Sequence, residues 1–146
     1  MTIYFDMDGT LANLYAVENW LPKLRNYDPS PYMEAIPMLD LRVLAHVLNQ
    51  LQREGYKLGI ISWLSKGSTL IYDEAVRTRK LRWLKKHLGS IQWDELHLVK
   101  YGRPKHYIAE DKSGILFDDN AEIRNKWKGK AYTEKEILPT LKTMLK

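Results

Sequence analysis

Short apolar runs alternate with longer stretches of helical periodicity along this sequence. The apolar runs cover residues 3–5, 56–62, 96–99 and 114–117, with a final short run at 130–132. Strands that alternate with helices pair in parallel, because the chain has to cross over before each strand returns to the sheet. The sequence therefore predicts an α/β fold, a Rossmann-like, doubly wound and mainly parallel sheet with helices on both faces.

Helices are expected wherever apolar residues recur at intervals of three and four between the runs. The expected helices cover residues 11–24, 41–51, 70–88 and 123–127, with a further helix opening at Arg103-Pro104-Lys105 and a last one near the C-terminus. Thr133 and Glu136 have capping-box spacing before that last helix, and Pro139 is expected to break or delay its first turns. Residues 1–146 are interpreted as a single domain, with residues 13–38 as a small helical cap inserted after the first strand.

Bulk properties exclude several classes of protein. No apolar run reaches the ~20 residues that a membrane-spanning helix needs, and we expect a cytoplasmic protein without a signal peptide or a membrane partner. There are no cysteines, which excludes disulfides, thiol nucleophiles and thiolate metal sites;. The formal net charge of +5 favours anionic partners, from small phosphates to nucleic acid;. Nothing in the sequence indicates an oligomeric state.

Polar side chains stand where the predicted strands end. In open α/β sheets, ligands bind at the carboxyl ends of the strands. Alone, each of these residues has an ordinary structural interpretation, such as a helix N-cap, a turn hydroxyl or a surface charge. Together they predict one site. They are Asp6, Asp8 and Thr10 after the first run, Ser62 and Trp63 at the end of the second, Lys105 at a helix start after the third, and Asp118 and Asp119 after the fourth.

These residues resemble the ordered motifs of the haloacid dehalogenase-like (HAD) phosphatase superfamily. Asp6-Met7-Asp8-Gly9-Thr10 is similar to the first motif, DxDGT, and the resemblance extends from Tyr4 to about Trp127. The later motifs are a Ser or Thr after a strand, a Lys at a helix start and an acidic pair. Trp63 departs from the pattern, because many members have a small residue or proline there. The matching residues are Ser62, Lys105 and Asp118-Asp119, with Lys100 and Lys112 as rivals to Lys105.

A Mg²⁺-dependent phosphomonoesterase is what the resemblance implies. A dianionic phosphate ester repels carboxylates unless a cation neutralises it, and Mg²⁺ suits a site of carboxylates and waters. The metal would be held by Asp6, the backbone carbonyl of Asp8, and Asp118, with Asp119 holding the metal, orienting water on it or orienting Lys105. The family implies that Asp6 attacks phosphorus and becomes an aspartyl phosphate.

The remaining motif residues have roles in the same scheme. Asp8 would protonate the leaving group and then deprotonate the hydrolytic water. Thr10, Ser62, Lys105 and the backbone amide near Trp63 would bind the phosphate.

The opening Asp6–Ala12 and the stretch 82–89 resemble the 5′(3′)-deoxyribonucleotidase branch of the superfamily. In that branch a small helical cap covers the site and aromatic side chains stack on the base. The insert carries four aromatic residues that could do this or simply pack against their neighbours. They are Tyr15, Trp20, Tyr27 and Tyr32.

Three functions are consistent with the sequence. The first is a phosphomonoesterase that acts on a nucleotide or another small phosphate ester. The second is a phosphatase for the end of a polynucleotide, and the third is a non-catalytic nucleic-acid-binding module on the same fold. A basic run in the helix after Ser62 could track a nucleic-acid backbone or form a solvated face. It consists of Arg77, Arg79, Lys80, Arg82, Lys85 and Lys86.

Overall fold

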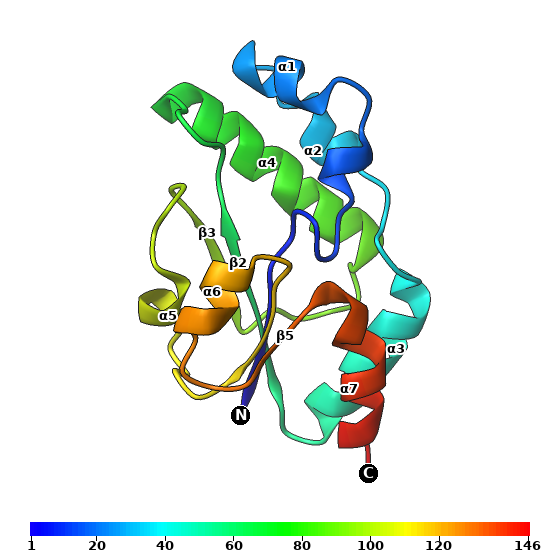
Figure 1. Ribbon diagram of the computed structural model, residues 1–146. Helices are drawn as coiled ribbons and strands as arrows, with labels where there is room; N and C mark the ends of the chain where they lie inside the picture. Colours follow the sequence, from blue (N-terminus) through cyan, green and yellow to red (C-terminus); the bar gives the residue numbers. More distant parts are fainter.

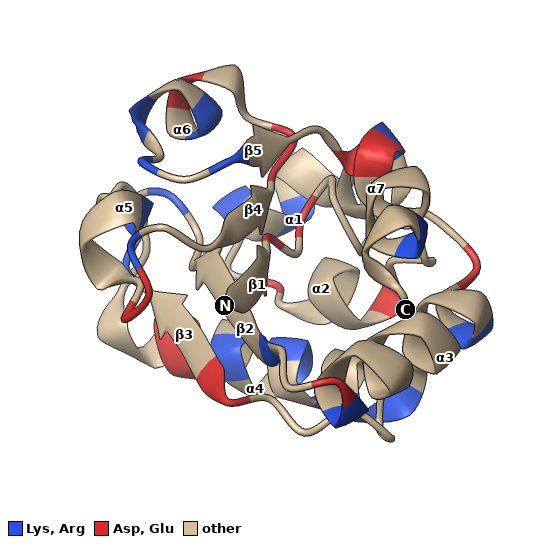
Figure 2. Ribbon diagram, turned by 90° about the horizontal axis from the view of Figure 1, so that it is seen from below, with Lys and Arg blue, Asp and Glu red and all other residues tan.

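Five parallel strands form one sheet, which confirms the predicted α/β class. The computed structural model describes residues 1–146 and orders the strands β3-β2-β1-β4-β5, with β1 in the centre (Figure 2). Ile3 of β1 lies opposite Leu58 of β2 and Ile115 of β4, so β1 and β4 end at the same level and β2 runs three residues further. The strands are β1 (Thr2–Phe5), β2 (Lys57–Trp63), β3 (Glu95–Val99), β4 (Ile115–Phe117) and β5 (Ala131–Tyr132).

Helices cover both faces of the sheet (Figures 1 and 2). They are α1 (Trp20–Arg25), α2 (Ser30–Glu34), α3 (Leu41–Arg53), α4 (Leu70–His87), α5 (Lys105–Ile108), α6 (Ala121–Lys126) and α7 (Ile137–Met144). Two single turns of 3-10 helix, Leu14–Ala16 and Glu134–Glu136, complete the chain. None of these helices is both long and apolar enough to cross a bilayer.

The central strand is buried on both faces because its side chains alternate between two cores. Ile3 and Phe5 belong to the larger core, which the sheet shares with α3, α4 and α7. Tyr4 points the other way and joins a smaller core with Trp127 at the end of α6. Its ring meets the Trp127 ring edge-on, with the centroids 5.5 Å apart. Both cores anchor β1, and β1 carries the polar residues that follow it.

The helix predicted for residues 11–24 is wrong in its first half. The carbonyl of Met7 accepts hydrogen bonds from the amides of Leu11 and Ala12, which closes a tight loop instead of starting a helix. Gly9 has φ +80°, a conformation that glycine adopts at little cost;. Ala12 then forms an isolated bridge with Pro37. The apolar residues that suggested helical spacing therefore pack from a loop.

Residues 13–38 contain one 3-10 turn, α1 and α2, and lie over the end of the sheet where β1 and β2 finish (Figure 1). α4 holds this insert in place. The indole nitrogen of Trp83 donates to the carbonyl of Ala35 at 2.7 Å, and the Tyr72 hydroxyl donates to the carbonyl of Asp28 at 2.9 Å.

The predicted capping box at Thr133 and Glu136 is present, but it opens the 3-10 turn before the last helix. Pro139 does not break α7, which begins at Ile137. A proline is tolerated in a first turn because amides there have no intrahelical partner. The expected break at Pro139 is therefore absent, whereas the α-helix does begin late, after the 3-10 turn Glu134–Glu136.

Candidate active site

Three carboxylates gather at the carboxyl ends of neighbouring strands β1 and β4. Asp6, Asp118 and Asp119 each offer an oxygen, and these atoms lie within 4.8 Å of one another. The amide of Asp6 donates to the carbonyl of Phe117 at 3.0 Å, which extends the strand pairing up to the site. Parallel register thus places residues 112 positions apart in one cluster.

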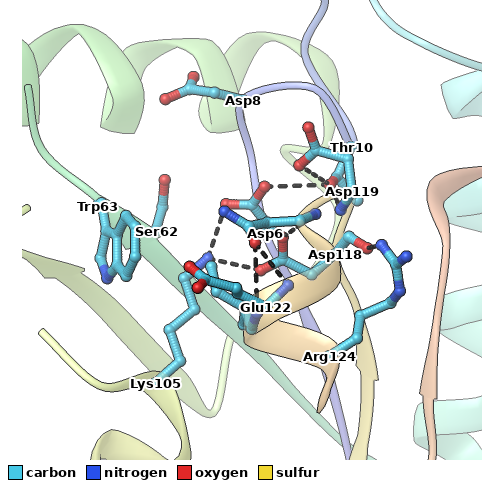
Figure 3. A network of polar contacts seen from close by, with 12 residues as sticks. Asp6, Asp8, Thr10, Ser62, Trp63, Lys105, Asp118, Asp119, Glu122 and Arg124 are labelled. Atoms are coloured by element: carbon cyan, nitrogen blue, oxygen red, sulfur yellow. Dashed lines mark hydrogen bonds and ion pairs between the residues drawn. The ribbon is translucent and has the colours of Figure 1, made fainter. Parts of the chain in front are cut away.

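The ammonium of Lys105 lies between two of these carboxylates (Figure 3). Its Nζ donates to Asp6 Oδ1 at 2.9 Å and to Asp118 Oδ2 at 2.8 Å, and the side chain is buried. Burial lowers the pKa of Lys105, but the two carboxylates outweigh burial and raise it above the ordinary value;. Lys105 is therefore a permanent cation at the base of the cluster.

The two rival lysines lie elsewhere. Lys100 is exposed. Lys112 donates instead to the carbonyls of Tyr107 and Ala109. Among the three lysines considered from the sequence, Lys105 is the one in contact with the carboxylates.

One lysine does not neutralise three carboxylates. Burial, together with repulsion from Asp6, raises the pKa of Asp118 to about 6 despite its contact with Lys105. Burial and the same neighbour raise the pKa of Asp119 to about 8. The cluster thus carries a negative charge that a further cation would relieve.

The donor set fits Mg²⁺. All three side chains offer oxygen, the ligand that Mg²⁺ prefers, and Mg²⁺ is held by one or two carboxylates plus water and phosphate oxygens;. The Asp8 side chain is outside this cluster. Asp6, Asp118 and Asp119 are thus the side chains able to hold the ion.

Asp8 points away from the cluster, toward α4 (Figure 3). Its Oδ2 accepts a hydrogen bond from Nζ of Lys80 at 2.8 Å. Burial raises the pKa of Asp8, and the Lys80 ammonium opposes that rise. Asp6 and Asp8, two positions apart, therefore have different charged neighbours, which is the arrangement that separates the roles of two carboxyl groups.

Thr10 and Ser62 are fully buried behind the site. The Thr10 hydroxyl donates to Asp6 Oδ2 at 3.1 Å and accepts from the Asp119 amide at 3.2 Å, so it links two members of the cluster. The Ser62 hydroxyl accepts from Lys80 at 2.7 Å. In this arrangement both hydroxyls contact the protein's own ionic groups and neither lines the pocket described next.

A pocket of about 290 Å³ opens above the carboxylates. Its polar residues include Asp6, Asp8, Lys105, Asp118 and Asp119. Its apolar lining comes from the insert, from the end of β2 and the residue after it, from the loop after β3, and from α6. The wall residues are Leu14, Tyr15, Trp20, Leu21 and Leu24 of the insert, with Trp63, Leu64, Tyr101 and Ile123.

Two pairs of aromatic side chains line this pocket. Tyr15 and Trp20 meet edge-on at 5.0 Å between centroids, and Trp63 and Tyr101 are 4.9 Å apart. Trp63 is fixed by a 2.8 Å hydrogen bond from its indole nitrogen to the carbonyl of Arg103.

The other two aromatic residues of the insert serve packing. Tyr27 packs against Tyr72, and Tyr32 lies over Lys80. Two of the four aromatic residues singled out in the insert thus reach the pocket.

Gly9 allows the first loop to approach the acidic pair. A Cβ at this position would collide with the carboxyl group of Asp119 and come within 2.9 Å of the Tyr15 ring. The positive φ and the close approach together require glycine here;. Gly9 thus lets the loop after β1 lie directly against Asp119, which follows β4.

Sequence reasoning missed Lys80. It was grouped with a basic run, yet its side chain is only 1% exposed, while Arg82, Lys85 and Lys86 of the same run are exposed. Val76 and Trp83, four before and three after it, are buried on the same face of α4. A lysine in register with core residues was the signal that could have identified it.

Comparisons with known proteins add little to this picture. No family model matches the sequence, and no curated protein matches it either. Among solved structures, a D,D-heptose 1,7-bisphosphate phosphatase from Burkholderia thailandensis has a similar arrangement, with a TM-score of 0.48 and 10% sequence identity. The alignment covers 83% of this chain and 67% of that one. A similarity of this degree carries no argument about function.

Proposed function

We propose that this protein is a phosphatase of the HAD superfamily, a Mg²⁺-dependent phosphomonoesterase that works through an aspartyl phosphate on Asp6. One observation carries the proposal. Asp6 lies among Lys105, Asp118 and Asp119, while Asp8 is paired with a separate cation, Lys80. The five residues other than Lys80 line one pocket. A nucleophile and an acid–base group need this division.

The proposed reaction has two steps. Asp6 attacks phosphorus, the bond from phosphorus to the ester oxygen breaks, and Asp8 gives its proton to that oxygen as the alcohol leaves. Asp8 then takes a proton from a water molecule that attacks the phosphoryl group, which releases phosphate and restores Asp6. Lys105 holds Asp6 in place and offsets its charge. Bound Mg²⁺ would supply charge neutralisation for the phosphoryl oxygens.

We propose a nucleotide as the substrate class. The pocket beside the carboxylates is lined by two aromatic pairs, Tyr15 with Trp20 and Trp63 with Tyr101. A planar base fits such walls, because stacking on an aromatic ring contributes about 1–3 kcal/mol per base. The exposed Lys66 also lines the pocket and suits an anionic ligand.

We expect the wild-type protein, assayed with Mg²⁺, to hydrolyse nucleoside monophosphates faster than glycerol phosphate, which has no ring to stack. Phosphate release from both esters and from a 5′-phosphorylated oligonucleotide is the measurement. Faster release from the oligonucleotide would instead favour a polynucleotide end phosphatase. Release from none of them would contradict the proposed function and leave a binding module as the remaining hypothesis.

Chelation should abolish turnover, and added Mg²⁺ should restore it, because the carboxylate cluster needs a cation before a dianion can enter. Binding can be measured without activity, since a ligand at 100 times its Kd stabilises the native state by about 2.7 kcal/mol. We therefore expect Mg²⁺ to raise the Tm of the wild type and not that of Asp118→Asn. Full turnover in a metal-free buffer would contradict the assignment.

A further inference from the structure

We propose that Lys80 is a positioning residue for the reaction, holding the carboxyl group of Asp8 at the place from which it exchanges protons with the substrate and with water. This inference rests on the proposed function and extends it to a residue outside the pocket. It starts from the position of Lys80 on α4, the helix that also holds the insert over the site.

Every proton of the Lys80 ammonium has an acceptor. Nζ donates to Asp8 Oδ2 at 2.8 Å, to Ser62 Oγ at 2.7 Å and to the carbonyl of Trp63 at 2.7 Å. A lysine ammonium has three donors, so its hydrogen-bonding capacity is complete. The three acceptors come from the loop after β1 and the end of β2, which the ammonium thereby ties together.

The environment of Lys80 excludes a surface role. The side chain is 1% exposed, and lysine is almost never fully buried unless it is paired. The ring of Tyr32, from α2, faces the ammonium with 5.1 Å between Nζ and the ring centroid. Lys80 does not line the pocket, so it reaches the reaction only through the groups that it contacts.

The contact leaves half of the Asp8 carboxyl group free. Oδ2 is bound to Lys80, whereas Oδ1 has no hydrogen-bond partner within the protein, and Asp8 lines the pocket. One oxygen therefore fixes the orientation of the group while the other is available to a ligand. An acid–base group has to lie within hydrogen-bond reach of the atom that it serves.

Without the ammonium, nothing else among the observed contacts holds this side chain. Asp8 has no second hydrogen bond, and rotation about its Cα–Cβ bond would swing the carboxyl group away from its present place. A displacement of about 1 Å at a reacting group can cost about 10²-fold in rate. Loss of Lys80 should therefore damage the step that depends on Asp8 more than the attack by Asp6.

The test compares Lys80→Met, Lys80→Arg and the matched control Lys86→Met, an exposed lysine on the same helix. Methionine keeps the unbranched shape of the side chain, one heavy atom shorter, and removes all three donors. We expect Lys80→Met to lower kcat for a nucleoside monophosphate about 10²-fold, with KM within threefold. The rate at which the first equivalent of nitrophenol is released from nitrophenyl phosphate should fall much less, because that leaving group hardly needs a proton. Lys80→Arg should recover part of the loss, and Lys86→Met should match the wild type.

A purely structural Lys80 would give a different pattern. Both substrates would then slow equally, and the loss in Lys80→Met would add to that of Asp8→Asn in the double variant, which would overturn the proposal. If Lys80 acts through Asp8, the double variant should be no slower than Asp8→Asn alone.

A second readout needs no activity. In a crystal structure of Lys80→Met we expect the Asp8 carboxyl group to leave its present place, and an unmoved group would overturn the inference. If that variant does not fold, the NMR resonance of the Lys80 Nζ is compared between the wild type and Asp8→Asn. An unchanged resonance would likewise overturn the inference. Absence of turnover by the wild type would contradict the proposed function, whereas the position of Asp8 would still decide this inference.

Discussion

Asp6→Asn is expected to lower phosphomonoesterase turnover at least ~10³-fold, about 4 kcal/mol of barrier, with the fold intact. The amide is nearly the same size and can still accept a hydrogen bond from Lys105, which now contacts Asp6 at 2.9 Å. It lacks the negative charge that attacks phosphorus, and it is a poorer ligand for a cation. Initial rates on a nucleoside monophosphate, with circular dichroism to check the fold, make the measurement.

Asp40→Asn is the matched control for that experiment. Asp40 caps α3 by accepting from the amides of Arg42 and Val43, and asparagine caps a helix equally well;. This variant should keep wild-type activity. Turnover by Asp6→Asn within tenfold of the wild type, or ~1.4 kcal/mol of barrier, would remove Asp6 from the role of nucleophile.

Asp8→Asn is expected to separate substrates by their leaving groups. A sugar oxygen needs a proton as it departs, and a nitrophenolate hardly does, so the variant should lose ~10²–10⁴-fold on a nucleoside monophosphate. The first step on nitrophenyl phosphate should be nearly spared. The second step should slow on both substrates, because no base remains to activate water.

That combination predicts a burst of nitrophenol followed by slow turnover, and a phosphoenzyme that acid quenching traps on Asp6. The fold should be preserved, since the asparagine oxygen can still accept from Lys80, the present partner at 2.8 Å. Equal slowing of both leaving groups, with no trapped phosphoenzyme, would make Asp8 a structural residue of the loop.

Much of the fold follows from local patterns in the sequence. The runs around Ile3, Leu58, Leu98 and Leu116 are short, apolar and separated by helical stretches, and such runs pair in parallel in one sheet;. Because parallel strands end at one edge, the polar residues that follow them had to approach each other. Asp6, Lys105 and Asp118 accordingly lie within hydrogen-bond distance.

Other features depend on partners distant in sequence. The residues around Leu11 have helical spacing, but the Met7 carbonyl and the positive φ of Gly9 close them into a loop. Of the insert's aromatic residues, Tyr15 and Trp20 face the pocket while Tyr32 is committed to packing, a difference that helical spacing does not encode.

Lys80 shows most clearly what the sequence alone does not reveal. In the sequence it is one positive charge in a basic run, and only the placement of α4 across the end of β2 brings it to Asp8, Ser62 and Trp63. The sequence by itself determined the sheet and the residues at its carboxyl edge, because periodicity and strand ends are local properties. The tertiary structure decided which charges meet and which are buried, because a buried ammonium is stable only where the fold supplies acceptors for all its protons.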